Sequence, residues 1–316
     1  MRARSLSVVA TILLTLSSLG CNVAVARFYN ERGLKHYNKG DYTQALADFD
    51  LAIRFHPWFA EAFTNRGLVY TELGNQDRAI SDHDRAITIN PKLALAFNNR
   101  GYAFYHKRDY DTAIVDYDHA IRLNPQLGIA YSNRGLAYYE KGDYERTIAD
   151  CTKAVSYNPK LAVAFNNRGL AHYMQQDFTL AIADYDEALR LQPWLGQART
   201  NRGLARYEQG EFELALSDLN EAIRLAPRDY QALLTRGRTY QAVGDLDGAI
   251  RDFTTVIDFV PASLHAHYNR GLCFMQKGRK AEAADDFKFM LENSRIQEDK
   301  DEATAWLRKL GSKYLK

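Results

Sequence analysis

The chain has 316 residues, of which 46% are hydrophobic, 12% aromatic and 25% charged. This mixture provides ample core material and excludes a disordered or collagen-like chain. The formal net charge of +2 argues against a protein that binds nucleic acid through a basic surface, and three cysteines are too few for a disulfide framework.

The first 26 residues differ in character from the rest of the chain. Arg2 and Arg4 precede an uncharged, mostly apolar run over residues 6–19. A run of this length is short for a membrane-spanning helix and is typical of the apolar region of a signal peptide. We therefore expect residues 1–26 to be an export signal that directs the protein to a bacterial periplasm or an envelope membrane.

Two processing sites fit this segment, and the sequence leaves both open. Ala24-Val25-Ala26 has the small-x-small pattern of an ordinary signal peptidase site, which would make Arg27 the new N-terminus. Leu19-Gly20-Cys21 resembles a bacterial lipobox, which would make Cys21 the lipidated first residue. Only a lipid anchor at Cys21 or an uncleaved signal would attach this chain to a membrane.

A repeat of 34 residues follows this segment. All seven prolines recur at this interval, and eight repeats align without insertion over residues 26–297. The repeats begin at Ala26, Ala60, Ala94, Gly128, Ala162, Gly196, Tyr230 and Leu264. Positions are counted from the first residue of each repeat.

Each repeat is predicted to form two helices joined by tight turns. Apolar residues recur at helical spacing, as at Phe97, Gly101 and Phe104 in the first helix of repeat 3. Position 8 is glycine in all eight repeats and position 20 is alanine in seven, which lets the two helices approach closely. Glycine at position 15 and the aspartate that usually follows it suit a helix end and the next N-cap, and the proline at position 32 ends the second helix.

This pattern resembles the tetratricopeptide repeat, a helix-turn-helix unit of 34 residues. The resemblance covers residues 26–297 and implies an all-α fold, a right-handed α-solenoid superhelix whose first helices line a concave face. Residues 298–316 resemble the family's capping helix, which shields the end of the stack from water. The apolar stripe of this segment contains Ala303, Trp306, Leu307 and Leu310.

Two charged columns depart from the family pattern. Position 7 is arginine in every repeat, from Arg32 to Arg270, and position 23 is aspartate in every repeat, from Asp48 to Asp286. An arginine row could bind an acidic ligand, or each arginine could pair with the aspartate of its own repeat. We favour the pairing, because the two columns match repeat for repeat.

A row of asparagines at position 6 is the first candidate binding feature. By resemblance to peptide-binding members of the family, asparagines in this register line the concave groove and pair with the backbone of an extended chain. The alternative is that they bridge neighbouring repeats or contact water. The row consists of Asn65, Asn99, Asn133, Asn167 and Asn201.

Leucine and tyrosine columns flank this row, at positions 9 and 12, and predict a groove for an extended segment with apolar side chains. The central members are Leu136, Leu170, Tyr105, Tyr139, Tyr173 and Tyr207. Members of the family that clamp the terminal carboxylate of chaperone tails carry a lysine at position 5 and an asparagine at position 9. Neither column is present here, so that class of ligand is not expected.

Nothing in the sequence predicts catalysis. The histidines are scattered, and there is no phosphate-binding loop, nucleophile elbow or HExxH motif, so we expect no enzyme, no cofactor and no metal site. The leading hypothesis is an exported scaffold that binds other proteins through its concave face. The alternative is a self-assembling subunit of an envelope complex, a homo-oligomer whose groove is filled by its own or an identical chain.

Overall fold

The computed structural model describes residues 22–311 and residue 314. Residues 1–21 of the expected export signal, Cys21 included, lie outside these described residues, whereas residues 22–26 belong to the first described helix. In the described part the chain is all helix and turn without a strand, as the sequence predicts. The chain divides into two compact halves between Asn167 and Arg168.

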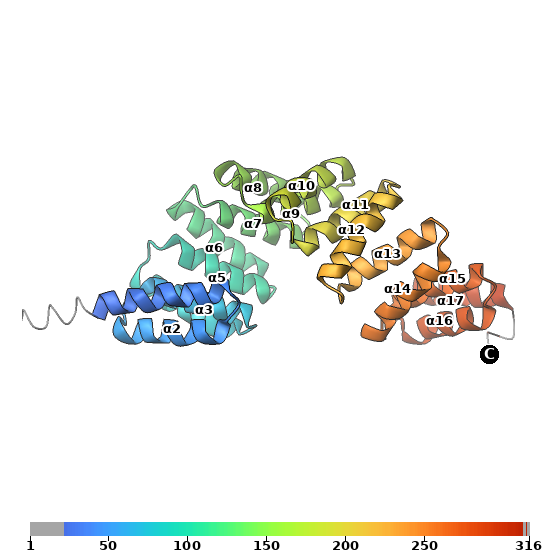
Figure 1. Cartoon of the computed structure of the whole chain (residues 1–316), viewed down its shortest axis with the longest axis horizontal. Helices are drawn as coiled ribbons and strands as arrows, with labels where there is room; N and C mark the ends of the chain where they lie inside the picture. The colour runs from blue at the N-terminus through green and yellow to red at the C-terminus, as the bar shows by residue number, and fades with distance from the viewer. Residues whose placement is uncertain (1–21, 312–313, 315–316) are drawn as a thin grey trace, which may run out of the picture. The chain divides into compact units, whose positions relative to one another are not determined.

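Consecutive helices form antiparallel hairpins, two helices to a repeat (Figure 1). The N-terminal half contains a helix over residues 22–38 and the helices α2 (Tyr42–Phe55), α3 (Ala60–Glu72), α4 (Gln76–Ile89), α5 (Ala94–His106), α6 (Tyr110–Leu123), α7 (Gly128–Glu140) and α8 (Tyr144–Tyr157). The division between the halves falls within α9 (Ala162–Met174). The C-terminal half continues with α10 (Phe178–Leu191), α11 (Gly196–Glu208), α12 (Phe212–Leu225), α13 (Tyr230–Ala242), α14 (Leu246–Phe259), α15 (Leu264–Gln276), α16 (Lys280–Asn293) and α17 (Gln297–Leu310).

The turn inside each repeat is built as the sequence predicts. Gly142 has a φ of +77°, a left-handed conformation that glycine adopts without steric cost, and the next residue, Asp143, caps α8 by accepting a hydrogen bond from the Arg146 backbone N–H. Where glycine is missing, Arg108 and Gln176 take the same conformation, with φ values of 62° and 63°. The turn geometry is therefore kept in repeats that lack its preferred residue.

Close approach of the two helices of a repeat depends on the glycine at position 8. A Cβ atom on Gly101 would lie 2.9 Å from Cε1 of Tyr117, closer than real Cβ contacts allow. Tyr117 is fully buried, and residues at its position face the glycine of their own repeat throughout the chain. The packing of α5 on α6 thus requires a residue without a side chain at this point.

The helix α17 lies where the sequence predicts a capping helix. Ala303, Leu307 and Leu310 are buried, and the Trp306 ring stacks on Phe287 of α16 with centroids 6.0 Å apart. The charged residues of its first turn, Glu298 and Asp299, are followed by basic residues in its last turn, which suits the helix dipole at both ends. This helix covers the apolar face that α15 and α16 would otherwise expose.

Candidate protein-binding face

The arginines at position 7 bind the aspartates at position 23 within each repeat. In all eight repeats the guanidinium Nε donates to the aspartate Oδ2 at position 23 over 2.7–3.0 Å, and Nη2 donates to Oδ1. The aspartates are only 2–6% exposed. The predicted pairing within each repeat is therefore confirmed, and these arginines do not form a ligand-binding row.

Most of these arginines also join their repeat to the preceding one. Nη1 of Arg134 donates to Oδ1 of Asp118 over 2.5 Å, and Arg100 reaches Asp84 in the same way over 2.6 Å. The acceptor stands at position 25 of the preceding repeat, where Arg236 finds Asn220 and Arg270 finds Thr254. This third contact was not predicted from the sequence, although aspartates recur at position 25.

Burial acts against the charged form of the aspartate in the pair formed by Arg66 and Asp82. Burial raises the pKa of the Asp82 carboxyl although the guanidinium of Arg66 opposes this effect. The hydrogen bond from Arg66 to Asp82 in turn raises the pKa of the arginine above its usual value. Such a pair adds little net stability but is costly to break on one side, because the remaining charge stays buried.

The predicted asparagine row is half-buried except for Asn167, which is buried, and three of its members bridge repeats. Nδ2 of Asn65 donates to Oδ1 of Asn30 over 2.9 Å, and Nδ2 of Asn133 donates to Oδ1 of Asn98 over 3.1 Å. Nδ2 of Asn167, which is only 7% exposed, donates to the hydroxyl of Ser132 over 3.3 Å. These bonds join position 6 of one repeat to position 5 of the preceding repeat.

The remaining members of the row differ from these three. Asn99 accepts a hydrogen bond from the side chain of its neighbour Asn98 over 2.9 Å, and Asn201 lines a cavity in the C-terminal half. An amide has two N–H groups and a carbonyl oxygen, so one donated bond does not exhaust it. The row therefore combines a stacking role with the capacity to bind a ligand, and its role in ligand binding remains a prediction.

The predicted leucines and tyrosines are half-buried on the same helices. Each tyrosine at position 12 packs on the aromatic ring at position 17 of its own repeat, with centroids 5.4–5.8 Å apart. Burial raises the pKa of Tyr105, and so does Glu140, which accepts its hydroxyl hydrogen bond over 3.0 Å. Leu136 and Tyr139 belong to the N-terminal half, whereas Leu170, Tyr173 and Tyr207 belong to the C-terminal half.

The most exposed residues on this side are at position 2, which the sequence pattern did not predict. In a helix, positions 2, 6 and 9 lie one above the other. Leu95 is 47% and Val163 37% exposed, with half-buried Ile129 between them in sequence at the same position. We call the side formed by positions 2, 6, 9 and 12 of the first helices the A-face; in α5 it consists of Leu95, Asn99, Tyr102 and Tyr105.

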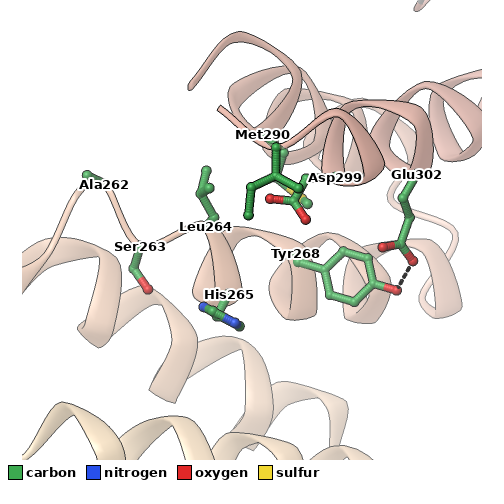
Figure 2. A pocket seen from close by; sticks show the side chains of 9 residues that line it. Ala262, Ser263, Leu264, His265, Tyr268, Met290, Asp299 and Glu302 are labelled. Atoms are coloured by element: carbon green, nitrogen blue, oxygen red, sulfur yellow. Dashed lines mark hydrogen bonds between the residues drawn. The ribbon is translucent and has the colours of Figure 1, made fainter. Parts of the chain in front are cut away.

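Three cavities lie along the A-face among the described residues of the C-terminal half. The first, of about 350 Å³, lies between α11 and α13 and includes Asn201. The second, of about 360 Å³, lies between α13 and α15 and includes Arg238. The third, of about 510 Å³, lies between α15 and α17, with Tyr268 and Glu302 in its wall (Figure 2).

The described residues contain neither a cluster of side chains suited to a metal ion nor a helix long and apolar enough to cross a membrane. The A-face instead offers exposed apolar side chains, amides and small cavities. These features are typical of surfaces that bind other proteins or small ligands.

Family models match most of the repeats. Two models described as tetratricopeptide repeat match residues 60–93, 128–161, 162–194, 200–240 and 234–294, and one described as TPR repeat matches residues 101–142. No curated protein sequence matches the chain significantly.

Solved structures show the same fold. A chain of the APC/C hetero-tetramer Cut9-Hcn1 is 14% identical with a TM-score of 0.72; the match covers 88% of this chain and 54% of that one, so the present chain spans about half its length. PilF of Pseudomonas aeruginosa is 17% identical with a TM-score of 0.57, covering 70% of this chain and 98% of its own. PilW, a type IV pilus biogenesis factor, is 19% identical with a TM-score of 0.59, covering 66% and 96%.

Proposed function

We propose, because the chain belongs to the tetratricopeptide-repeat family, that it is an exported scaffold that binds an extended segment of a partner protein through its A-face. Scaffolds of this family are not enzymes and act by binding other proteins. The proposal assigns the binding role to particular positions of the repeat and leaves the others to stability.

The proposal rests on the different roles that the positions of the repeat have in the structure. The side chains at positions 7 and 23 form the Arg–Asp pairs, and the residues at positions 8 and 24 form the contact between the two helices of a repeat. Positions 2, 6 and 9 keep apolar and amide groups at the surface, as in Leu95, Asn99 and Tyr102 of α5. Exposed apolar side chains edged by polar groups are typical of protein-binding surfaces.

The chemistry of the A-face suits an extended segment better than a folded domain. An extended backbone presents N–H and C=O groups along its whole length, and side-chain amides can both donate to and accept from them. Half-buried tyrosines add contact area at low entropy cost, because their rings are already held by packing. An isolated helix, whose backbone groups are bonded internally, would leave these amides unused.

Photocrosslinking in cells tests this proposal. A photoreactive amino acid replaces Leu95 on the A-face of α5, and in a matched control it replaces Val115, which is 54% exposed on α6. We expect one discrete protein partner at Leu95 and none at Val115. In the double variant Ile129→Ser and Val163→Ser, the Leu95 product should disappear while the melting temperature of the chain is retained.

Two outcomes would argue against the binding of a partner protein through the A-face. Equal products at Leu95 and Val115 would contradict binding through the A-face. A product at Leu95 made only of this chain, together with a dimeric molar mass in solution, would favour the self-assembling subunit instead.

Export followed by lipid attachment at Cys21 is the second part of the proposal. Ala26 is fully buried within the helix over residues 22–38, so cleavage after Ala26 would remove a buried residue of the first repeat. Cleavage before Cys21, which lies outside the described residues, would keep this helix intact. Helix integrity thus favours the lipobox over the ordinary signal peptidase site.

Metabolic labelling with an alkyne fatty acid distinguishes the two sites. We expect labelled protein in the envelope membrane fraction for the parent and none for Cys21→Ser, with Cys151→Ser labelled like the parent. An unlabelled parent whose N-terminal residue is Arg27 would contradict the lipid anchor and leave the binding role of the A-face untouched.

A further inference from the structure

The three cavities of the C-terminal half form a row along the A-face. The first two share Gln231, and the second and third share His265; both residues are at position 2 of their repeats. The first two cavities therefore open between one first helix and the next, and the third opens between α15 and the capping helix α17, each sharing one lining side chain with its neighbour. Each is of the size of small ligand sites, which occupy about 300–1,000 Å³.

The middle cavity has the donors that recognise a carboxylate. Arg238 stands at position 9, where six of the eight repeats carry leucine, so stacking of the repeats does not require it. Its guanidinium lies over the Tyr207 ring at 4.5 Å and forms an ion pair with Glu208, whose Oε1 is 3.6 Å from Nη2, too far for a hydrogen bond, so its N–H groups remain available to a closer acceptor. An acidic side chain in this cavity could bind the guanidinium at about 2.7–2.9 Å, the usual length of a charge-assisted hydrogen bond.

Other side chains of the middle cavity support the same assignment. Asn269 donates one N–H to the His265 carbonyl over 2.7 Å and has a second N–H to offer. The Thr235 hydroxyl donates to the Gln231 carbonyl over 2.8 Å, so its proton is already used. The amide of Gln231 stands on the rim shared with the first cavity, whose wall is polar.

The third cavity has an apolar wall and negatively charged side chains, in contrast to the middle cavity with its arginine. Leu264, Met290 and Ile296 provide an apolar wall, and Ile296 is 58% exposed. Two carboxylates flank this wall. Asp299 accepts a hydrogen bond from the Ser294 hydroxyl over 2.6 Å, and Glu302 accepts one from Tyr268 over 2.6 Å (Figure 2). They would repel an acidic side chain, so this cavity favours a large apolar side chain and rejects the residue that Arg238 attracts.

The distance between cavities sets the spacing of such a ligand. Neighbouring packed helices are about 8–10 Å apart, and an extended chain rises about 3.1–3.4 Å per residue. Three residues of an extended chain therefore span the step from one cavity to the next. In a polyproline II conformation, which has three residues per turn, side chains at this spacing also point to the same side.

We infer that the C-terminal half reads an extended partner segment in which an acidic side chain and a large apolar side chain are three residues apart. The acidic side chain binds Arg238 in the middle cavity, and the apolar side chain enters the cavity between α15 and α17. The inference rests on the proposed function and adds the chemistry of the segment that is bound.

Fluorescence polarisation with defined peptides tests this inference on the purified full-length chain. The probes are labelled Gly/Ser peptides with one glutamate and one leucine three residues apart, in both orders. Matched peptides replace the glutamate by glutamine, replace the leucine by serine, or separate the two by five residues. One of the two orders should bind about tenfold more tightly than each matched peptide, the factor expected for a charged hydrogen bond.

Two protein variants test whether Arg238 causes the preference for glutamate. Arg238→Leu introduces the residue that most repeats carry at this position, so the fold should be kept. Arg251→Leu removes the same charge from the exposed side of α14. The glutamate preference should vanish in Arg238→Leu and persist in Arg251→Leu, and Ile296→Ser should remove the leucine preference alone.

The inference is overturned if neither order binds more tightly than its matched peptides, or if Arg238→Leu keeps the glutamate preference. Because Leu95 lies in the N-terminal half, partner capture there would still support the proposed function. The two failures can therefore be told apart.

Discussion

The guanidinium of Arg134 donates two parallel hydrogen bonds to the carboxylate of Asp150, each 2.7 Å long, and so ties α7 to α8. Asp150 is only 4% exposed, and the remaining Nη1 of Arg134 bonds Asp118 of the preceding repeat. The same arrangement recurs along the chain. The charged residues at positions 7 and 23 are thereby accounted for by packing within and between repeats, and the proposed binding role falls to other positions of the repeat.

Breaking this pair on one side should destabilise the fold. Arg134→Ala leaves Asp150 buried without its partner, and we expect a loss of about 3–5 kcal/mol in the free energy of unfolding. The double replacement Arg134→Met with Asp150→Leu should cost much less. Urea unfolding measures both, with the exposed Arg122→Ala as a charge-matched control; a stable Arg134→Ala chain would refute the structural role.

His83 should make the protein less stable in mild acid. It fills the position taken by Phe49 and Tyr117 in neighbouring repeats, is fully buried, and neither ring nitrogen has a hydrogen-bond partner in the structure. Burial, with a smaller contribution from the positive charge of Arg100, lowers the pKa of His83 from 6.5 to about 3. Between these two values the unfolded chain binds more protons, so this residue's contribution to stability falls as the pH falls.

His83→Phe should therefore stabilise the chain and remove this pH dependence. The difference between variant and parent should grow by about 1.4 kcal/mol for each pH unit below 6.5, until the folded-state pKa is approached. Urea midpoints at pH 7 and pH 5 provide the comparison. A difference that stays constant over this range would show that His83 is not held neutral by burial.

Restoring glycine in the irregular turns should stabilise them. Arg108 and Gln176 adopt the left-handed conformation that glycine takes at position 15 elsewhere, and this costs a residue with a side chain about 1–2 kcal/mol. Glycine's larger entropy loss offsets about 0.5–1 kcal/mol of that gain. Arg108→Gly should thus raise the melting temperature slightly, whereas Lys107→Gly, at a residue with φ of −80°, should lower it.

The asparagine row should contribute to stability whether or not it also binds a ligand. Asn133→Ala removes the hydrogen bond to Asn98, and we expect a loss of about 0.5–1.5 kcal/mol in the free energy of unfolding. A double-mutant cycle with Asn98→Ala should show coupling between the two sites. Asn293→Ala, which removes a bond within a single helix, serves as the control. No coupling between Asn98 and Asn133 would mean that the row does not hold repeats together.

Repetition explains how much of this fold could be predicted. Because arginine at position 7, glycine at position 8 and aspartate at position 23 recur in all eight aligned repeats, the pattern itself indicated helices, turns and the Arg–Asp pairing. The third arginine contact, from Arg134 to Asp118, crosses between repeats and was missed, although its acceptor column contains several aspartates.

The candidate site was less predictable. The exposed fraction of Leu95 depends on how closely neighbouring helices pack against α5, and the cavity beside Arg238 depends on gaps between side chains of different repeats. Neither the exposed fraction nor the cavity can be predicted from the spacing of residues in the sequence. Arg238 could have been noticed as a departure from the leucine column, but its place in a cavity wall could not.

A crosslinking scan through the repeats tests the central claim most directly. A photoreactive residue would be placed in turn at position 2, from Leu95 to His265, and at position 22 of the same repeats, where Val115 and Arg251 stand and every residue is exposed. The account predicts partner products at position 2, recurring every 34 residues along the chain, and none at position 22. Products concentrated at position 22 would contradict it, because the partner would then bind the second helices and the A-face would not be the binding surface.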